Sequence, residues 1–474
     1  MTTSAGRTPA RHSPKSLRAD VTGSLRDAEP RVFWLDRADR PEPRPALTAP
    51  ASADLIIVGG GFAGLWTAVL AKERDPGRDV LLVEGDRIGW AASGRNGGFC
   101  SASLTHGREN GARRFPAEID QVDELGRRNL DEIEESLRRH GIGCDFERTG
   151  SLSVAVEPYQ VALLRDSGEP VLDQSGVRSE VNSPTYLAGV WNRHDTALLH
   201  PARLAWGLAA TAERLGVRIA EETSIRRIRK SASGVSLTTG GGVNLTARRV
   251  ALGTNAFPSL LRRTRLYTVP VYDYVLVTEP LSASQLASVG WRNRQGVDDI
   301  ANQFHYYRLT PDNRILWGGY DAVYHYGRHV RPRYDQRPPT FAKLAGHFFV
   351  TFPQLEGIRF THRWAGAIDT CTRFFAFHGT ALDGRVAYVQ GFTGLGVAAT
   401  RFGAQVMLDQ LDGQQTARTS LGLVRRRPLP FPPEPFAYVG IQLTRAALAA
   451  ADRSEGHRNL WLRVLDRLGL GFDS

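Results

Sequence analysis

The chain has 474 residues, with 60 Lys+Arg against 49 Asp+Glu, and its net charge is +11. At roughly 150 residues per domain, this length predicts two or three domains, and a hydrophobic content of 42% allows a large core. The positive charge is nearly all arginine, spread along the chain without interleaved aromatic residues, which argues against nucleic-acid binding. Three distant cysteines form neither a disulfide framework nor a metal site, so we expect no metal and a cytoplasmic location.

The N-terminal 50 residues have no apolar segment typical of a secretory signal, and no apolar run in the chain reaches the roughly 18 residues of a membrane span. Residues 1–32 are rich in Arg, Pro, Ser and Thr, which predicts a disordered tail. Residues 33–50 are expected to form a linker, in which Phe33-Trp34-Leu35 packs on a domain surface before a Pro-rich stretch.

The next segment has the pattern of a βαβ unit. A strand is expected at Asp54–Val58, a helix at about Ala63–Arg74 and a second strand at Val80–Glu84. Strands that alternate with a helix in this way predict a parallel sheet.

Glycines between the first strand and the helix form the pattern G-x-G-x-x-G. Gly59 allows a tight turn, Gly61 lets the backbone approach a pyrophosphate, and Gly64 lets the helix pack close to the strand. The helix N-terminus offers N–H groups to the phosphates. Glu84, 20 residues after Gly64, is placed to accept both hydroxyls of a ribose. A glycine-rich loop with a surface glutamate is the structural alternative. The strand, the glycines, the helix, the second strand and the acid follow one another in the expected order and spacing, and this predicts dinucleotide binding.

The rest of the chain alternates helical and extended patterns, and a turn at Pro311–Asn313 predicts a hairpin. Amphipathic spacing predicts helices at Glu118–His140, Leu204–Leu215 and Leu460–Leu468. Extended patterns predict strands within Cys144–Val156, Val217–Thr254 and residues 268–320.

Two further glycine clusters follow the first. The stretch "ASGRNGGF" (Ala92–Phe99) lies close after Glu84, and the turn Gly391–Gly396 opens a late helix. Either cluster alone could be a structural turn. Together they suit a ligand longer than NAD, because the N–H groups and dipole of the late helix could stabilise the negative charge of a reduced flavin. We therefore expect FAD.

The pattern resembles the D-amino-acid oxidase/glycine oxidase superfamily of FAD-dependent oxidoreductases, and looks most similar to gamma-glutamylputrescine oxidase-like proteins. The resemblance covers roughly residues 50 to 415 and rests on "IIVGGGFAGL", "RIGWAASGRNGGF", "VALGTNAF", "YYRLTPDNRILWGG", "FPQLEGIRFTHRWAG" and "GFTGLGV". It implies an α/β fold with a Rossmann-like FAD-binding domain, discontinuous in sequence, and a β-sheet-rich α+β substrate domain.

The domain boundaries expected on this basis divide the chain into interleaved segments. The FAD-binding domain takes residues 51–145, 195–262 and 360–420, the substrate domain takes 146–194 and 263–359, and a C-terminal extension takes 421–474.

The resemblance also implies which residues would hold a non-covalent FAD. They are Gly59, Gly61, Phe62, Ala63 and Gly64 at the pyrophosphate; Glu84, Gly85 and Arg87 at the adenosine; Ser93, Gly94, Asn96, Gly97 and Gly98 between pyrophosphate and flavin; Thr254 and Asn255 where the chain passes again; and Gly394, Leu395, Gly396 and Val397 at the pyrimidine edge.

The sequence departs from the family pattern at two places near the expected flavin. Leu395 stands where members often have His, and "CTRFFAFHG" (Cys371–Gly379) replaces a proline-containing segment. Cys371 raises the question of covalent flavin attachment, but its local context does not match that of the cysteine used for this elsewhere in the superfamily.

Amine oxidation needs few protein groups, because the flavin accepts the hydride at N5 and the protein mainly orients the substrate. Tyr306 and Arg308 share one face of an expected strand. Tyr306 could contact the amine by a cation–π interaction and Arg308 could bind a substrate carboxylate. Tyr272 and Trp364 are further candidates for the catalytic wall. For each residue the alternative is core packing or a local ion pair, and His305 is expected to be structural.

The sequence thus predicts an FAD-dependent oxidoreductase that oxidises the C–N bond of a primary or secondary amine, such as a carboxylate-bearing polyamine derivative. Its partners would be the small-molecule amine and O2, with an imine or aldehyde and H2O2 as products; the oligomeric state stays open. The alternatives are a dehydrogenase that uses a protein or quinone acceptor and a catalytically silent flavin-binding protein.

Overall fold

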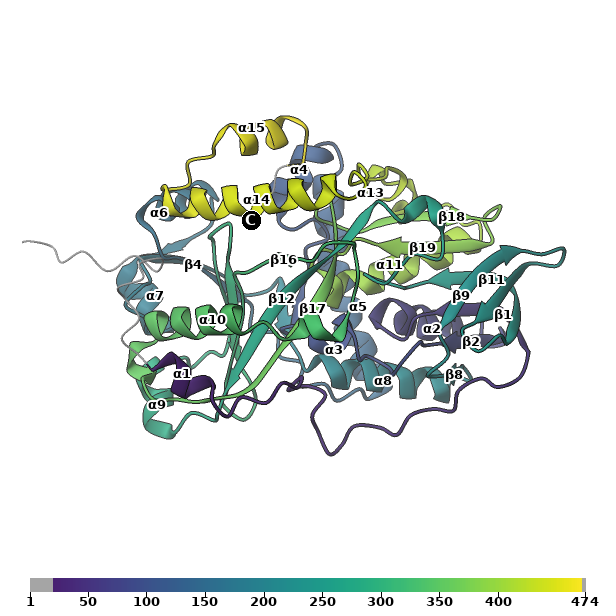
Figure 1. Cartoon of the computed structure of the whole chain (residues 1–474), viewed down its shortest axis with the longest axis horizontal. Coiled ribbons are helices and arrows are strands. Elements are labelled where there is room, and N and C mark those ends of the chain that lie inside the picture. Colours follow the sequence, from purple (N-terminus) through teal and green to yellow (C-terminus); the bar gives the residue numbers. More distant parts are fainter. Residues whose placement is uncertain (1–19, 471–474) are drawn as a thin grey trace, which may run out of the picture.

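The computed structural model describes residues 20–470 of the chain. It contains two large sheets, one of eight strands and one of nine. Hydrophobic clusters cover both faces of the eight-stranded sheet, a further one belongs to the nine-stranded sheet, and Val275, Val277 and Leu316 of the latter join a cluster of the former. The two sheets lie side by side, with β1 and β11 in one half of the molecule and β4 and α10 in the other (Figure 1). This arrangement agrees with the predicted pair of domains, one nucleotide-binding and one rich in β-sheet.

The eight-stranded sheet has a parallel centre in the order β19-β11-β1-β2-β8, with β18 antiparallel at one edge and the hairpin β9-β10 attached to β11. Its strands are β1 (Ala51–Val58), β2 (Val80–Val83), β8 (Arg218–Ala220), β9 (Ile225–Lys230), β10 (Val235–Thr239), β11 (Asn244–Leu252), β18 (Phe377–Ala381) and β19 (Val386–Gln390). Ile56 and Ile57 of β1 are both fully buried, because a central parallel strand is covered on both faces.

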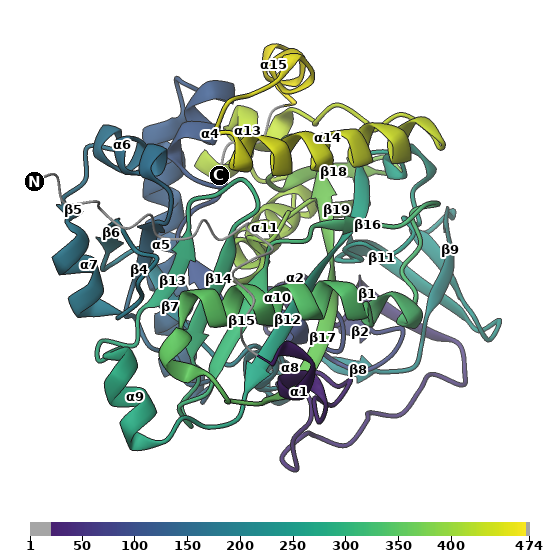
Figure 2. The ribbon, with the colours of Figure 1, turned by 60° about the vertical axis from the view of Figure 1, so that its left-hand side comes forward.

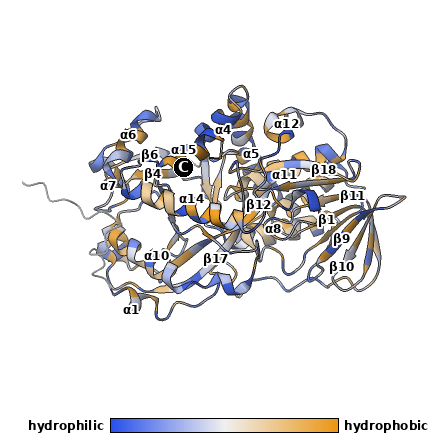
Figure 3. Ribbon diagram, turned by 45° about the horizontal axis from the view of Figure 1, so that its top comes forward, coloured by the Kyte–Doolittle hydropathy of each residue, from blue (hydrophilic) through white to orange (hydrophobic). Residues whose placement is uncertain are grey.

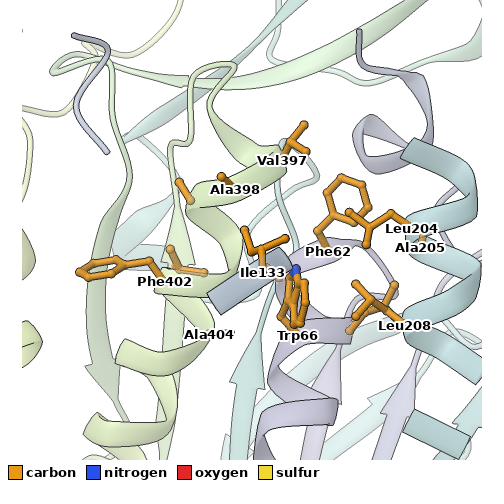
Figure 4. Close-up of a cluster of buried hydrophobic side chains, with 14 of the residues drawn as sticks. Phe62, Trp66, Ile133, Leu204, Ala205, Leu208, Val397, Ala398, Phe402 and Ala404 are labelled. Carbon is orange, nitrogen blue, oxygen red and sulfur yellow. The ribbon is translucent and has the colours of Figure 1, made fainter. Parts of the chain in front are cut away.

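Four helices pack together beside this sheet: α2 (Phe62–Arg74), α5 (Ile119–His140), α8 (Pro201–Arg214) and α11 (Gly396–Leu411). Figure 4 shows their shared cluster, in which Trp66 of α2 lies between Leu208 of α8 and Ile133 of α5. Trp66 is fully buried. The predicted helices at 63–74, 118–140 and 204–215 are therefore confirmed, and their packing sets the position of the glycine loop that precedes α2.

The nine-stranded sheet is mostly antiparallel and runs in the order β16-β12-β15-β14-β13-β4-β6-β5, with β17 paired to β12. Its strands are β4 (Ser151–Ala155), β5 (Val171–Leu172), β6 (Ala188–Asn192), β12 (Thr268–Thr278), β13 (Gly296–Asp299), β14 (His305–Leu309), β15 (Ile315–Gly319), β16 (Val323–Tyr324) and β17 (Phe360–Cys371). The hairpin predicted at Pro311–Asn313 joins β14 to β15, and Asn313 has a φ of 60°. A separate two-stranded sheet consists of β3 (Phe99–Ser101) and β7 (Thr196–Leu198).

One predicted boundary differs from the structure. Residues 360–371 were expected in the FAD-binding domain, but they form β17, which pairs with β12 from Thr268↔Cys371 to Thr278↔Phe360. The antiparallel pairing runs along the whole segment, so the segment belongs to the nine-stranded sheet. The chain returns to the first sheet only at β18.

The N-terminal segment is more ordered than the composition suggests. Residues 1–19 of the expected disordered tail lie outside the described residues, but residues 20–32 include α1 (Val21–Leu25). Ala28 is buried, and Glu29 N–H donates to the Thr361 carbonyl at 2.8 Å. In the linker that follows, Trp34 is 1% exposed and its Nε1 donates to the Asn96 carbonyl at 2.9 Å. The expectation of disorder up to residue 32 is thus wrong for residues 20–32. Contacts with β17, a strand distant in the sequence, order this polar segment.

Apart from α3 (Ala92–Arg95), which contacts α8 and β17 in the interior, the remaining helices lie at the periphery and at the C-terminus. They are α4 (Arg108–Arg114), α6 (Pro158–Asp166), α7 (Gln174–Glu180), α9 (Ala283–Val289), α10 (Pro338–Thr351), α12 (Ala417–Ser420), α13 (Gly422–Arg425), α14 (Phe436–Arg453) and α15 (Leu460–Arg467). Hydrophilic residues gather on outer helices such as α4, α6 and α7 (Figure 3). Across residues 20–470, no helix combines the length and apolar character needed to cross a bilayer.

Helix α14 is the main element of the C-terminal extension. It runs across the substrate-side half, with α15 on its outer side (Figures 1 and 2). Asp452, near its C-terminal end, accepts the backbone N–H groups of Asn302 and Gln303 at 2.9 and 3.0 Å. Gln442 Nε2 donates to the Tyr324 carbonyl at 3.0 Å. These bonds fix α14 to the loop before β14 and to β16.

Candidate active site

A cavity of about 2160 Å³ lies between the two sheets and reaches from the carboxyl ends of β1 and β2 to β12, β14 and α14. Pockets for drug-sized ligands have volumes of roughly 300–1,000 Å³. The cavity therefore has room for a dinucleotide and a substrate together. In an open α/β sheet the carboxyl ends of the parallel strands are the expected place for such a ligand.

The glycine loop at the end of β1 has the geometry of a phosphate cradle. Gly59 has a φ of +113°, and a Cβ there would lie 2.5 Å from the Gly253 carbonyl oxygen. A Cβ on Gly64 would lie 1.9 Å from the Gly59 carbonyl oxygen, so α2 packs against the turn only with glycine there. Gly61 lines the cavity and precedes the first residue of α2. The N-terminus of α2 thus lies in the cavity wall, where its N–H groups can bind an anion in the cavity.

Glu84 lines the cavity at the end of β2. Its carboxylate accepts the N–H groups of Gly60 at 2.5 Å and Asp86 at 2.9 Å, and the indole N–H of Trp90 at 3.0 Å. Burial raises the pKa of Glu84, while these donors act in the opposite direction. Trp90 also lies beside Phe257, with ring centroids 5.5 Å apart, and both rings line the cavity. This end of the cavity therefore offers a carboxylate and two aromatic rings, which suits an adenosine.

The stretch "ASGRNGGF" forms α3 and the turn after it. Asn96 holds the turn, since its Oδ1 accepts the Gly98 N–H and its Nδ2 donates to the Ala92 carbonyl, both at 2.9 Å. Asn96 and Gly97 line the cavity. A Cβ on Gly97 would meet the Tyr306 ring at 2.6 Å, so the absence of a side chain lets β14 approach this turn.

The third glycine turn lies opposite, before α11. Gly394 has a φ of +95°, and Thr393 also has a positive φ, of 49°. Asp369 accepts the Gly391 N–H at 2.6 Å, and burial raises the pKa of its carboxyl to about 7. His106 Nε2 lies 2.5 Å from the Thr393 carbonyl oxygen. Burial lowers the pKa of His106, which favours its neutral form.

Most of the residues expected to hold FAD line this one cavity. They are Gly59, Gly61, Phe62, Ala63, Glu84, Gly85, Ser93, Asn96, Gly97, Thr254, Asn255, Gly394, Leu395, Gly396 and Val397. The glycine turns, the helix N-termini and the buried carboxylate together fit a long dinucleotide.

Four of the expected residues lie beside the cavity wall and not in it. Gly64, Gly94 and Gly98 are needed where chain segments pack closely: a Cβ on Gly94 would lie 2.2 Å from the Gly89 carbonyl oxygen, and one on Gly98 2.2 Å from that of Leu199. Arg87 donates to the Pro41 carbonyl at 2.6 Å. Packing between segments accounts for these positions, and their contact with the cofactor stays a prediction.

Tyr306 and Asp273 form a pair in the cavity wall on the side of the nine-stranded sheet. The Tyr306 hydroxyl donates to the Asp273 carboxylate, and both residues line the cavity. Burial raises the pKa of Asp273 to about 6, and burial together with the neighbouring carboxylate raises the pKa of Tyr306 well above its usual range. The pair therefore holds a proton acceptor that titrates close to neutral pH, next to an aromatic ring.

Arg308 does not face the cavity, contrary to the sequence prediction. It is 1% exposed, and its guanidinium donates to the carbonyls of Leu199 at 2.8 Å and Leu309 at 3.2 Å. Burial lowers its pKa to about 10. Tyr306 and Arg308 do share a face of β14, but that face turns toward Gly97 and Gly98, and Arg308 reaches past Gly98 into the protein.

Replacing Arg308 with Met is expected to destabilise the fold and not to alter substrate recognition. The carbonyls of Leu199 and Leu309 would lose a charged donor, which should lower the free energy of unfolding by about 3 kcal/mol. Urea unfolding measures this loss, with the exposed Arg292→Met as the control. An unchanged urea midpoint, or a selective loss of affinity for carboxylated amines, would contradict the structural role.

The other two aromatic candidates also lie in packed surroundings. Trp364 is buried and does not line the cavity, and its Nε1 donates to the Arg95 carbonyl at 2.9 Å, which agrees with the core-packing alternative. Tyr272 lines the cavity, but its hydroxyl accepts the Arg331 N–H at 3.1 Å. Burial raises the pKa of Tyr272 to about 12, so it stays neutral.

Several groups at the cavity were missed by sequence reasoning. Asp273 stands between two tyrosines in a strand pattern, and only the pairing of β12 with its neighbours brings it to Tyr306. His106 lies in a loop with no recognised motif, and it contacts Thr393, which is 287 residues later in the sequence. The C-terminal helix α14 also contributes to the wall, through Ile441, Thr444 and Arg445.

Comparison with known proteins agrees with this geometry. Residues 54–410 match the family model described as FAD dependent oxidoreductase, DAO. Gamma-glutamylputrescine oxidoreductase of Escherichia coli K12 is 31% identical over 401 residues, which cover 80% of this chain and 88% of the relative. A probable oxidoreductase OrdL of Haemophilus influenzae is 26% identical over 404 residues, covering 81% and 88%.

Solved structures show the same fold. Glycine oxidase from Geobacillus kaustophilus superimposes with a TM-score of 0.65 at 20% identity, covering 79% of this chain and 99% of that one. L-proline dehydrogenase from P. horikoshii superimposes with a TM-score of 0.62 at 17% identity, covering 77% and 95%. With the family match over most of its length and a cavity built for a dinucleotide, the chain belongs to the DAO family of FAD-dependent oxidoreductases.

Proposed function

We propose that this chain oxidises the C–N bond of a primary or secondary amine, including amines that carry a carboxylate, with O2 as the acceptor. The amine loses a hydride and a proton to become an imine, which water hydrolyses to a carbonyl compound. The two electrons and the protons reach O2 as H2O2. The observation that carries the proposal is the Tyr306–Asp273 pair, which faces the cavity opposite the glycine turns.

FAD, when bound, supplies the hydride acceptor. We propose that it lies along the cavity, with the loop Gly59–Ala63 at the pyrophosphate, Glu84 at the adenosine ribose, and Asn96, Gly97 and the turn Gly394–Val397 near the flavin. Non-covalent binding is supported by the cysteines: Cys100, Cys144 and Cys371 are all buried, and none of them lines the cavity.

The protein groups act on the amine and its proton. An amine that enters as an ammonium must lose a proton before it can give up a hydride, and the Asp273 carboxylate is placed to accept that proton. Tyr306 orients this carboxylate through its hydroxyl and presents its ring to the cationic amine. The relatives oxidise amines or amino acids according to their names, such as gamma-glutamylputrescine oxidoreductase and glycine oxidase, and this supports the same substrate class.

The experiment is an absorption spectrum of the purified protein, followed by anaerobic addition of single amines. The panel contains gamma-glutamylputrescine, putrescine, sarcosine, glycine and D-amino acids. We expect a flavin spectrum that one of these amines bleaches, with recovery and H2O2 formation on admission of O2. Bleaching without recovery in O2 would replace the oxidase by a dehydrogenase with another acceptor. A bound flavin that no amine reduces would support a silent flavin-binding protein, and a protein that takes up no FAD would overturn the proposal.

A further inference from the structure

Arg445 of α14 is a cation in the cavity wall that the sequence prediction did not include. It lines the cavity with Ile441 and Thr444 of the same helix, with Tyr272 of β12 and with Tyr320, the residue after β15. Its Nη1 donates to Gln442 Oε1 at 2.9 Å, whereas its Nε is buried and has no hydrogen-bond partner. A guanidinium has five N–H donors, so this one has capacity left for an acceptor in the cavity.

The charge around Arg445 is not balanced by protein carboxylates. Asp321 is 3% exposed, and three cations lie within 4 Å of it: Lys343 at 3.0 Å, Arg337 at 3.5 Å and Arg445 at 3.7 Å. Lys343 has the shortest distance and occupies both carboxylate oxygens. Arg445 is the most distant of the three cations, so Asp321 compensates its charge least. The excess of positive charge also affects His325: burial lowers its pKa, and Arg337, Arg333 and Arg445 lower it further.

We infer that Arg445 binds a carboxylate at the far end of an elongated amine substrate. This inference rests on the proposed amine oxidation and adds a specificity-determining residue to it. Arg308, the arginine expected for this role, is committed to backbone carbonyls. Arg445 belongs to the segment after residue 410, where the match to the family model ends. The anion subsite is therefore a feature of the C-terminal extension of this chain.

The position of α14 explains how the subsite is held. Gln442 is bonded to the Tyr324 carbonyl on one side of Arg445, and Asp452 to the loop of Asn302 and Gln303 on the other. These contacts fix the helix at both sides of Arg445, and the bond to Gln442 Oε1 holds the guanidinium itself. A preorganised cation of this kind binds a carboxylate with little ordering cost.

The test uses the full-length protein loaded with FAD and isothermal titration with glutarate, a dicarboxylate that cannot be oxidised at a C–N bond. Glutaramide, its neutral analogue, is the ligand control. Arg445→Gln is expected to weaken glutarate binding by about 10- to 100-fold, the range for a lost charge-assisted hydrogen bond. Arg453→Gln, an exposed position on the same helix, should leave it unchanged. Glutarate affinity that is equal in wild type and Arg445→Gln, or equally reduced in Arg453→Gln, overturns the inference.

A second variant leaves Arg445 in place. Ile441 lies one turn earlier on α14 and also lines the cavity, so Ile441→Glu brings a carboxylate within reach of Arg445 by the i,i+4 spacing. It should weaken glutarate binding as well, with glutaramide unaffected. Undiminished glutarate binding in this variant counts against the inference even if Arg445→Gln does not fold.

Kinetics separate this inference from the proposed function. With an amine that carries a distal carboxylate, Arg445→Gln should raise KM at least 10-fold with little change in kcat, while KM for putrescine stays the same. If no amine is oxidised, the proposed function fails and the glutarate titration still decides the role of Arg445. If amines are oxidised and a distal carboxylate gives no advantage in the wild type, only the role of Arg445 is overturned.

Discussion

Replacement of Asp273 by Asn is expected to lower kcat/KM for the amine substrate by about 10²- to 10⁴-fold, the usual range for loss of a general base. The amide keeps an oxygen that accepts the Tyr306 hydroxyl, but it cannot take a proton from an ammonium. The loss is measured by anaerobic flavin bleaching in stopped flow, so that reoxidation does not enter the rate.

The pH dependence gives this prediction a second readout. Because the pKa of Asp273 is about 6, the wild-type bleaching rate should rise as the pH increases through 6 and the carboxylate forms. Asp273→Asn should lack this limb. The raised pKa also means that ionised Asp273 costs stability: its favourable contribution is complete below about pH 4 and is lost as the pH rises through 6. The variant should therefore melt no lower than wild type at pH 8.

A matched control comes from another carboxyl in the same cavity wall. Asp298 accepts the hydroxyls of Ser151 and Ser153 at 2.7 and 2.8 Å, and burial raises its pKa too. Asp298 lies opposite Tyr306 in the β13–β14 pairing, and Asp298→Asn changes a second carboxyl of the cavity wall while the Tyr306–Asp273 hydrogen bond stays in place. We expect the bleaching rate of Asp298→Asn to rise through pH 6 as it does in the wild type. A similar rate loss in both variants would assign the effect to general electrostatics and would remove Asp273 from the mechanism.

Gly61→Ala is expected to reduce FAD affinity by about 10- to 100-fold while the fold persists, since phosphate contacts with backbone N–H groups would be displaced. Gly61 has a φ of −86°, which any L-residue adopts, so glycine is not required there by the backbone. An added Cβ would lie 2.9 Å from Ser93 Oγ, the atom that accepts the Phe62 N–H. In the protein itself the nearest obstacle to a side chain is thus Ser93 Oγ, and we expect the pyrophosphate to approach the same backbone from the cavity.

The loss is measured by titrating apoprotein with FAD and following the quenching of flavin fluorescence. Gly77→Ala, in the turn after α2, is the control, because a Cβ there meets only Asp75 at 3.4 Å. Both variants should show unchanged far-UV circular dichroism. Full flavin content in purified Gly61→Ala would mean that the pyrophosphate lies elsewhere in the cavity.

Local patterns in the sequence were sufficient for the nucleotide-binding half. The spacing of Gly59, Gly61 and Gly64, the strand Val80–Val83 and Glu84 all act over short distances along the chain, and such local geometry is encoded in residue order. The order of helices and strands around them followed from hydrophobic periodicity.

The substrate side could not be predicted as well, because it depends on tertiary pairing. Arg308 was correctly assigned to the same face of a strand as Tyr306. Its guanidinium, however, donates to the carbonyls of Leu309 and Leu199, and Leu199 is more than 100 residues away in the sequence. Asp273 and Arg445 are common residue types in ordinary patterns. Only the placement of β12 against β15 and of α14 across the cavity gives them a role.

The interleaved topology also bears on how the protein is made. Strand β1 pairs with β11, about 190 residues later, and β11 pairs with β19, which ends at Gln390. The βαβ unit of β1, α2 and β2 is synthesised long before β11. Until β11 is available, β1 has an unpaired edge, and such an edge is prone to aggregation. The third glycine turn follows β19, so the full cofactor cradle exists only after Gly396 has been synthesised. We therefore expect FAD to bind only after β19 and this turn have formed, so that the cofactor can stabilise the fold only at a late stage of folding.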